Sequence, residues 1–116
     1  MQLPTSFNAV IEKAASHSLY KQLIIQLNKD LTLGLVDLEL DLDILPTSLK
    51  YILHEKLQQL IDTNYETFLN LLYIIDVPEE RIKSIHANST FEFANEVTFL
   101  IVQREWQKVW MRHNYS

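Results

Sequence analysis

The chain has 116 residues, a formal net charge of −5 and 47% hydrophobic residues, which suits one globular domain over residues 1–116. One glycine and three prolines are too few for the many tight turns of an all-β protein, and the lack of cysteine excludes disulfides, thiolate metal sites and cysteine catalysis. The acidic balance argues against nonspecific nucleic-acid binding, which favours the opposite charge.

The amino-terminal stretch lacks the features of a targeting segment. Glu12 and Lys13 interrupt its apolar residues, which disfavours a signal peptide. The longest apolar runs, LLYII and FLIV, are far shorter than the roughly 20 residues that cross a bilayer. We therefore expect a cytoplasmic protein that does not bind membranes.

Two amphipathic helices are predicted in the first third of the chain. Apolar residues recur with helical spacing over residues 7–15, after a cap at Thr5 or Ser6, and again over residues 20–31. Gly34 predicts the end of the second helix, because glycine adopts a positive φ at little cost.

Residues 37–45, DLELDLDIL, alternate between acidic and apolar side chains. A helix there leaves Leu40 on the wrong face, so we favour an extended, leucine-rich acidic tether near residues 35–46, with its leucines against helices and its carboxylates in water. Alternate side chains of an extended segment lie about 6.6 Å apart, which is too far for them to share a calcium ion, so no metal is expected. The backbone of this tether then needs water or a second chain as its hydrogen-bond partner. The acids of the segment are Asp37, Glu39, Asp41 and Asp43.

Helical periodicity returns after Pro46 and continues to the end of the chain. Thr63 with Glu66, and Ser89 with Glu92, have the spacing of capping boxes at helix starts. The predicted fold is therefore an all-α, single-domain bundle of five or six helices, of which the helix from about residue 90 to residue 113 is the longest.

The last predicted helix has two apolar faces, and a helix that is apolar all round must be buried all round. One face carries Val97 and Ile101, and the second face lies nearly opposite. Either the amino-terminal helices cover the second face or a partner does, and a two-fold homodimer is the commonest such assembly. The candidate interface residues on the second face are Phe99, Val102, Trp106, Val109 and Trp110.

Basic residues continue the Val97 face of that helix as Arg104, Lys108 and Arg112. Cations near a helix carboxyl end interact favourably with the helix dipole. The stripe is also compatible with nucleic acid, which the net charge disfavours, and with contacts to the tether acids within one chain or between chains.

The sequence contains no recognisable catalytic constellation. HEKLQ, residues 54–58, starts like a zinc-protease helix but ends in glutamine where a histidine ligand is required. We therefore expect no cofactor and no enzymatic activity, and predict a protein–protein interaction module that forms a homodimer or binds another protein. The alternative is a pocket for a small apolar ligand, lined by Phe68, Phe99 and Trp106.

Overall fold

Residues 2–115, which the structure describes, form six helices in a computed structural model of the protein. This confirms the predicted all-α bundle. The helices are α1 (Phe7–Ser16), α2 (Tyr20–Leu33), α3 (Pro46–Thr63), α4 (Tyr65–Ile75), α5 (Glu79–Lys83) and α6 (Thr90–Tyr115).

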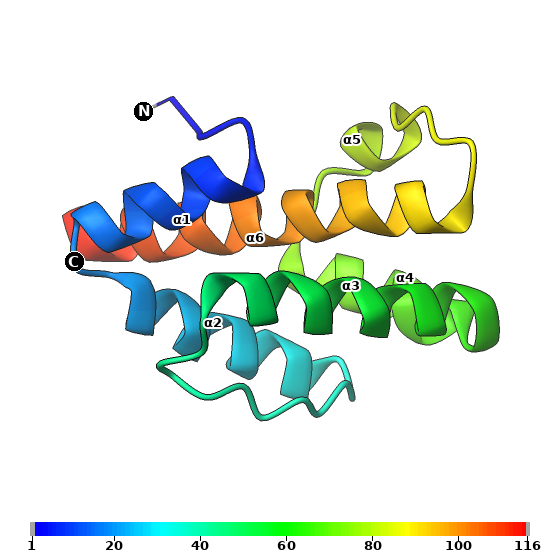
Figure 1. The fold of residues 1–116 in the computed structure, drawn as a ribbon, viewed down its shortest axis with the longest axis horizontal. Coiled ribbons are helices and arrows are strands. Elements are labelled where there is room, and N and C mark those ends of the chain that lie inside the picture. Colours follow the sequence, from blue (N-terminus) through cyan, green and yellow to red (C-terminus); the bar gives the residue numbers. More distant parts are fainter. Residues whose placement is uncertain (1, 116) are drawn as a thin grey trace.

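Helix α6 is the element around which the others are arranged. It contacts α1, α2, α3 and α4, and it runs beside α1 above a second layer of helices (Figure 1). That second layer contains α2, α3 and α4, and the whole molecule measures 36 × 28 × 25 Å. Because α6 is enclosed on several sides by its own chain, its apolar residues need not be confined to one stripe.

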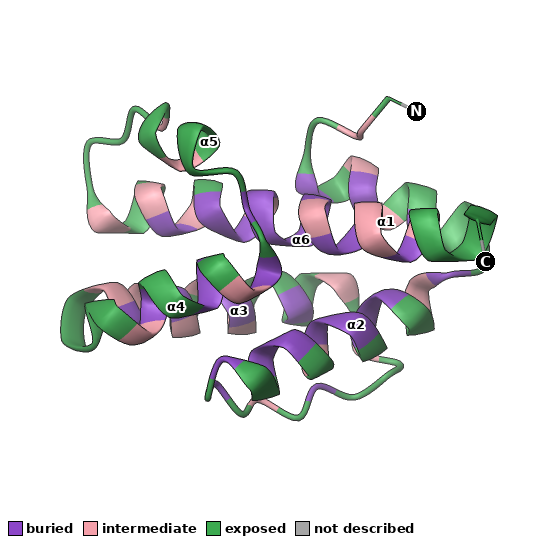
Figure 2. Ribbon diagram, turned by 180° about the vertical axis from the view of Figure 1, so that it is seen from behind, coloured by how far each residue is buried: buried purple, intermediate pink, exposed green. Residues whose placement is uncertain are grey.

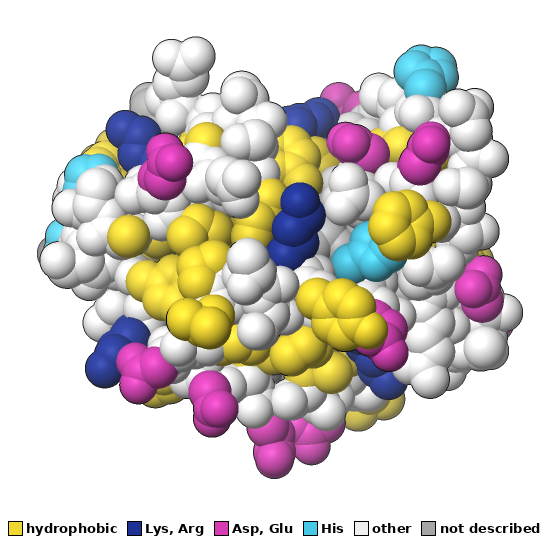
Figure 3. Space-filling view, viewed as in Figure 1, with side chains coloured by type: hydrophobic (Ala, Val, Ile, Leu, Met, Phe, Trp, Pro, Cys, Tyr) yellow, Lys and Arg dark blue, Asp and Glu magenta, His cyan; other side chains and the backbone are white. Residues whose placement is uncertain are grey.

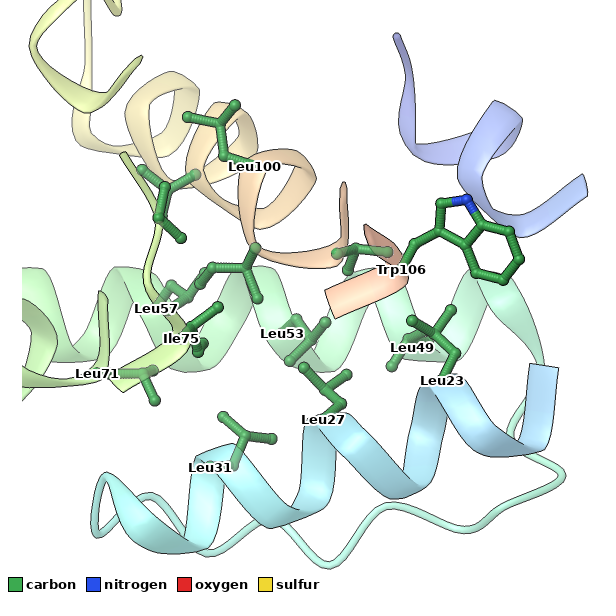
Figure 4. Close-up of a cluster of buried hydrophobic side chains, with 14 of the residues drawn as sticks. Leu23, Leu27, Leu31, Leu49, Leu53, Leu57, Leu71, Ile75, Leu100 and Trp106 are labelled. Carbon is green, nitrogen blue, oxygen red and sulfur yellow. The ribbon is translucent and has the colours of Figure 1, made fainter. Parts of the chain in front are cut away.

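The core forms where the leucine stripes of α2 and α3 meet beneath α6. Figure 2 shows buried residues along the sides of these helices that face one another. Leu23 and Leu27 of α2 approach Leu49 and Leu53 of α3, with Trp106 of α6 at one end of the cluster (Figure 4). Helical spacing therefore supplies the apolar faces, and their burial holds the layers together.

Three helices end in a residue with left-handed backbone geometry, and none of these residues is glycine. Ser18 follows α1 with φ 57°, Leu35 follows α2 with φ 64°, and Asp76 follows α4 with φ 68°. At each end two backbone N–H groups return to carbonyl groups in the last helical turn, as in a Schellman motif. Residues other than glycine are strained in this region of backbone geometry, so each of these helix ends carries a small cost in conformational energy.

Gly34 does not adopt the positive φ expected from the sequence. Its φ is −83°, and Leu35 takes the left-handed position instead. Position 34 has little room for a side chain, because an added Cβ would lie 2.8 Å from Cδ1 of the buried Leu71, which would have to shift. The prediction of a helix end at Gly34 was right, but the reason given for glycine was wrong.

We expect Leu35→Gly to stabilise the protein by about 0.5–1 kcal/mol, since it removes left-handed strain at a cost in unfolded-state entropy. Leu35 is 85% exposed, so the change removes little packing. Gly34→Ala is the matched comparison and should be destabilising, because the new Cβ collides with Leu71. Urea denaturation of both variants measures the two shifts, and a stabilising Gly34→Ala contradicts the account.

The predicted tether between α2 and α3, residues 35–45, is extended and without regular secondary structure, as predicted. We call it the strap. Its backbone is held by side chains of α2 and not by another strand. Asn28 accepts from the Leu40 N–H and donates to the Leu40 carbonyl, both at 2.9 Å, and the Tyr20 hydroxyl donates to the Ile44 carbonyl at 2.6 Å. These bonds supply, within the chain, partners that the sequence left to water or a second molecule.

The alternation of the strap is only partly retained. Leu40 is buried and Leu38 and Ile44 are half-buried, whereas Leu42 is exposed. A positive φ at Glu39 breaks the extended geometry, and the Ile44 N–H closes a turn on the Asp41 carbonyl at 3.0 Å. Asp37, Glu39, Asp41 and Asp43 all face solvent, as expected.

Two helix starts refine the predicted caps. Asn64, and not Thr63, caps α4 by accepting a bond from the Thr67 N–H. At α6 the Ser89 hydroxyl accepts from the Glu92 N–H, and the Glu92 carboxylate returns to the N–H of Asn88. The capping-box prediction for α6 therefore holds, except that the Glu92 carboxylate binds the N–H of Asn88, one residue before the Ser89 cap.

Candidate interaction surface

The predicted interface on α6 divides into enclosed and partly exposed residues. Val102, Trp106 and Val109 are buried inside the chain itself, and Trp106 is only 1% exposed. Phe99 and Trp110 are half-buried. The sequence left open whether other helices of the same chain or a partner bury this face. Helices of the same chain bury these three residues, because α1, α2 and α3 all contact α6. Only Phe99 and Trp110 keep surface for another molecule.

Trp110 belongs to a cluster of three aromatic rings at the carboxyl half of α6. Trp106 and Trp110 are one helical turn apart, with ring centroids 5.9 Å from each other. The His17 ring, which follows α1, lies edge-on to Trp110 at 4.8 Å and tilted over Trp106 at 6.0 Å. His17 directly follows α1, the left-handed turn at Ser18 leads on to α2, and both tryptophans belong to α6. The cluster therefore joins the end of α1 to α6.

Two surface depressions flank His17. The first, about 230 Å³, is lined by the aromatic cluster, by Lys13 and by Gln2 and Pro4 of the amino-terminal arm. The second, about 470 Å³, also includes His17 and is otherwise lined by Ser18, Leu19, Gln22, Val109, Arg112 and His113. We refer to Lys13, His17, Trp110, Arg112 and His113 together as the basic end.

Contacts between the α6 cations and the strap acids, one of the possibilities that the sequence allowed, are not formed among residues 2–115. Lys108 Nζ lies 2.7 Å from Asp30 Oδ2, and Arg112 Nη2 donates to Gln26 Oε1 at 2.8 Å. Arg104 binds the carboxyl end of α4 through the carboxylate and carbonyl of Asp76, each at 3.0 Å. The reason is geometric, since the inner side of α6 faces α2 and α4 whereas the strap acids point to solvent.

The strap acids therefore remain largely free. Asp43 lies 3.5 Å from Lys21, an exposed pair. Among residues 2–115 no ion pair involves Asp37, Glu39 or Asp41. Figure 3 shows acidic side chains along the lower edge of the molecule, where Figure 1 places the strap.

A buried polar cluster between α2 and α6 was missed by the sequence analysis. Glu105 is 0% exposed, and while its carboxylate is ionised neither of its oxygens has a hydrogen-bond partner. Lys108 Nζ lies 3.3 Å from Glu105 Oε1, close enough for an ion pair but without hydrogen-bond geometry. The buried carboxylate of Asp30 completes the cluster through its short bond to Lys108.

Burial acts to raise the pKa of both acids, and their hydrogen bonds and charged neighbours then shift the two pKa values in opposite directions. Burial, and then the hydrogen bond and charge of Asp30, raise the pKa of Glu105 to about 9, despite the attraction of Lys108. Burial also acts to raise the pKa of Asp30, but hydrogen bonds from Glu105, Lys108 and Gln26 outweigh it and lower that pKa. A protonated Glu105 that donates to the Asp30 carboxylate provides the partner that its oxygens otherwise lack.

A signal for this cluster was present in the sequence. Glu105 lies four residues after Ile101 of the first apolar face and four before Val109 of the second, so it is flanked by apolar residues of both faces. Asp30 lies between Leu27 and Leu31 of the α2 stripe. A charged residue inside an apolar stripe needs a buried partner, and the two such residues on α2 and α6 are partners.

The remaining candidate chemistry is dispersed. Among the described residues, no three His, Cys, Asp or Glu side chains come together as a metal site. The His54 ring contacts Phe91, with Nε2 2.9 Å from the Phe91 carbonyl oxygen, and is distant in sequence from His17. The aromatics of the predicted apolar pocket also separate: Phe68 is fully enclosed, and Phe99 lines a different depression from Trp106.

No helix among the described residues combines the length and the apolar character needed to span a membrane. The sequence matches no protein-family model, and searches of curated proteins and of solved structures found no significant similarity to this chain.

Proposed function

We propose that this protein is a non-catalytic interaction module of the cytoplasm that associates with a second copy of itself. The observation that supports the proposal is the separation of opposite charges on the surface of one acidic chain. The basic end gathers cationic and aromatic side chains, whereas the strap presents Asp37, Glu39 and Asp41 without ion-pair partners among residues 2–115. Complementary patches of this kind steer association and select its register.

Apolar surface accompanies the charge on both patches. Trp110 is half-buried at the basic end, and Trp is enriched where proteins bind one another. Within the strap, Leu35, Leu42 and Leu45 are exposed. Each copy carries both patches, so a two-fold dimer can form two equivalent contacts between the basic end of one copy and the strap of the other.

Sedimentation velocity over a range of protein concentrations tests the proposal. We expect a reversible dimer whose dissociation constant rises with salt, because its contacts are exposed ion pairs screened by ions. Neutralising the strap in Asp37→Asn/Glu39→Gln/Asp41→Asn should weaken the dimer at low salt. These side chains have no ion-pair partner in the described part of the chain, so the fold itself should be unaffected.

A variant with the same charge change elsewhere separates a local contact from the effect of net charge. Asp62→Asn/Glu66→Gln/Glu96→Gln neutralises three exposed acids on α3, α4 and α6, away from the strap. It should leave the dimer unchanged or slightly strengthen it by lowering like-charge repulsion. A protein that stays monomeric at high micromolar concentration and low salt, or two triple variants with equal effects, contradicts the proposal.

Binding of a small, mainly apolar ligand is a second candidate function. The observation that favours it is the cavity of about 230 Å³ that Trp106 and Trp110 line together with His17. Phe68 and Phe99 lie elsewhere, so the cavity has other walls than those predicted.

A further inference from the structure

We infer that the cavity between the amino-terminal arm and α6 is a binding site for a flat aromatic carboxylate of one ring. The inference rests on the second candidate function and does not require self-association. It specifies the chemical class of the ligand from the walls, the charge and the size of the site.

The walls of the cavity include three aromatic rings, which suit a flat apolar ligand. The rings of Trp106, Trp110 and His17 lie within 6.0 Å of one another, centroid to centroid, and none is parallel to another. Aromatic rings favour tilted and edge-on neighbours. Because Trp106 is almost fully buried, a planar guest contacts mainly the Trp110 and His17 rings. This depression of about 230 Å³, partly open to solvent, has room for one ring, since a closed cavity of roughly 150 Å³ already holds benzene.

The arm that closes the cavity is anchored to the core. Gln103, a buried residue of α6, donates from Nε2 to the Pro4 carbonyl at 2.8 Å. Pro4 lines the cavity, and its ring limits the backbone freedom of the arm. The site is thus formed before a ligand arrives, which is typical of small-molecule sites.

Charge selects the class of ligand. Of the described residues that line the cavity, Lys13 alone carries a permanent charge. Glu12 lines the adjacent groove along α1 but not this cavity. A cationic guest, which an aromatic cage would otherwise favour, meets the Lys13 ammonium, whereas a carboxylate on the ring gains an ion pair with it.

The two tryptophans of the chain are both in this cavity, so intrinsic fluorescence reports on it directly. The probe is 4-nitrobenzoate, a quencher, with neutral nitrobenzene and the cation 4-nitrobenzylammonium as charge variants of the same ring. N-acetyltryptophanamide measures the collisional quenching to be subtracted. We expect saturable quenching by the carboxylate with a dissociation constant on the order of 1 mM, as suits a single-ring ligand, and weaker binding of the other two probes.

Lys13→Ala tests the charge without altering the aromatic walls. It should weaken the carboxylate roughly two- to fivefold, the size of one exposed ion pair, and leave nitrobenzene unchanged. Lys29→Ala, which removes an exposed lysine of α2 outside the cavity, is the matched control and should bind like the unmodified protein.

The outcomes distinguish this site from the dimer contact. The strap variant Asp37→Asn/Glu39→Gln/Asp41→Asn should bind 4-nitrobenzoate normally, because the strap does not line the cavity. Quenching that never saturates, equal affinity for the three probes, or equal effects of Lys13→Ala and Lys29→Ala would overturn the inference. Sedimentation without any probe decides separately whether the protein self-associates.

Discussion

Trp106→Ala is expected to lower the free energy of unfolding by about 3–5 kcal/mol, the usual cost of truncating a large buried aromatic residue. Trp106 is 1% exposed and lies against the cluster of Leu23 and Leu49 (Figure 4). Because small domains are stable by only about 5–15 kcal/mol, this one change removes a large share of the total. Urea denaturation followed by far-UV circular dichroism measures the loss without relying on tryptophan fluorescence.

Trp110→Ala is the matched comparison, one helical turn away on the same helix. Trp110 is only half-buried, so we expect a loss nearer 1 kcal/mol. Both variants should be compared at one fixed protein concentration, since dimer formation adds to apparent stability. Equal losses in the two variants would mean that α1 and α2 do not enclose Trp106 as described.

Glu105→Gln is expected to remove most of the pH dependence of stability between pH 5 and pH 8. Folded Glu105 has a pKa of about 9, against 4.5 for the group in its ordinary state. Between these values the folded protein keeps a proton that the unfolded chain has released. Stability therefore falls as pH rises, by up to about 1.4 kcal/mol per pH unit for one proton.

The glutamine variant retains the size and polarity of Glu105 and cannot ionise. The free energy of unfolding of the variant is compared with that of the unmodified protein at two pH values. From pH 5 to pH 7 this comparison should shift in favour of the variant by about 2–3 kcal/mol. Glu12→Gln, the same substitution at an exposed position of α1, is the control and should leave the pH profile unchanged. Parallel profiles for the unmodified protein and Glu105→Gln would show that Glu105 is not held protonated.

Asp30 gives the opposite dependence on the acidic side. Its pKa is lowered in the folded state, so its contribution is present above the ordinary value of 3.8 and is lost as pH falls further. Together the two acids predict a stability maximum near pH 4–5, between the losses from Asp30 below and from Glu105 above. Thermal unfolding of the unmodified protein across pH 3–9 locates that maximum.

Two details of α2 show how far local patterns reach. The end of the helix at Gly34 was predictable, because the apolar stripe stops and a glycine follows. That the glycine serves Leu71 of α4, and that Leu35 takes the left-handed position, was not predictable, because a contact with a residue 37 positions away leaves no local signal. The Asn28 bonds to the strap are of the same non-local kind.

By itself, the sequence determined the helical class, the approximate helix ranges and the extended strap between Gly34 and Pro46. These depend on side-chain spacing, caps and backbone preferences within a few residues of each position. Only the tertiary structure decided that α1 and α2 cover the second apolar face of α6, that Glu105 meets Asp30, and that the α6 cations avoid the strap. Apolar burial is non-directional, so an apolar helix face indicates that it must be buried but does not indicate which helix, or which molecule, buries it.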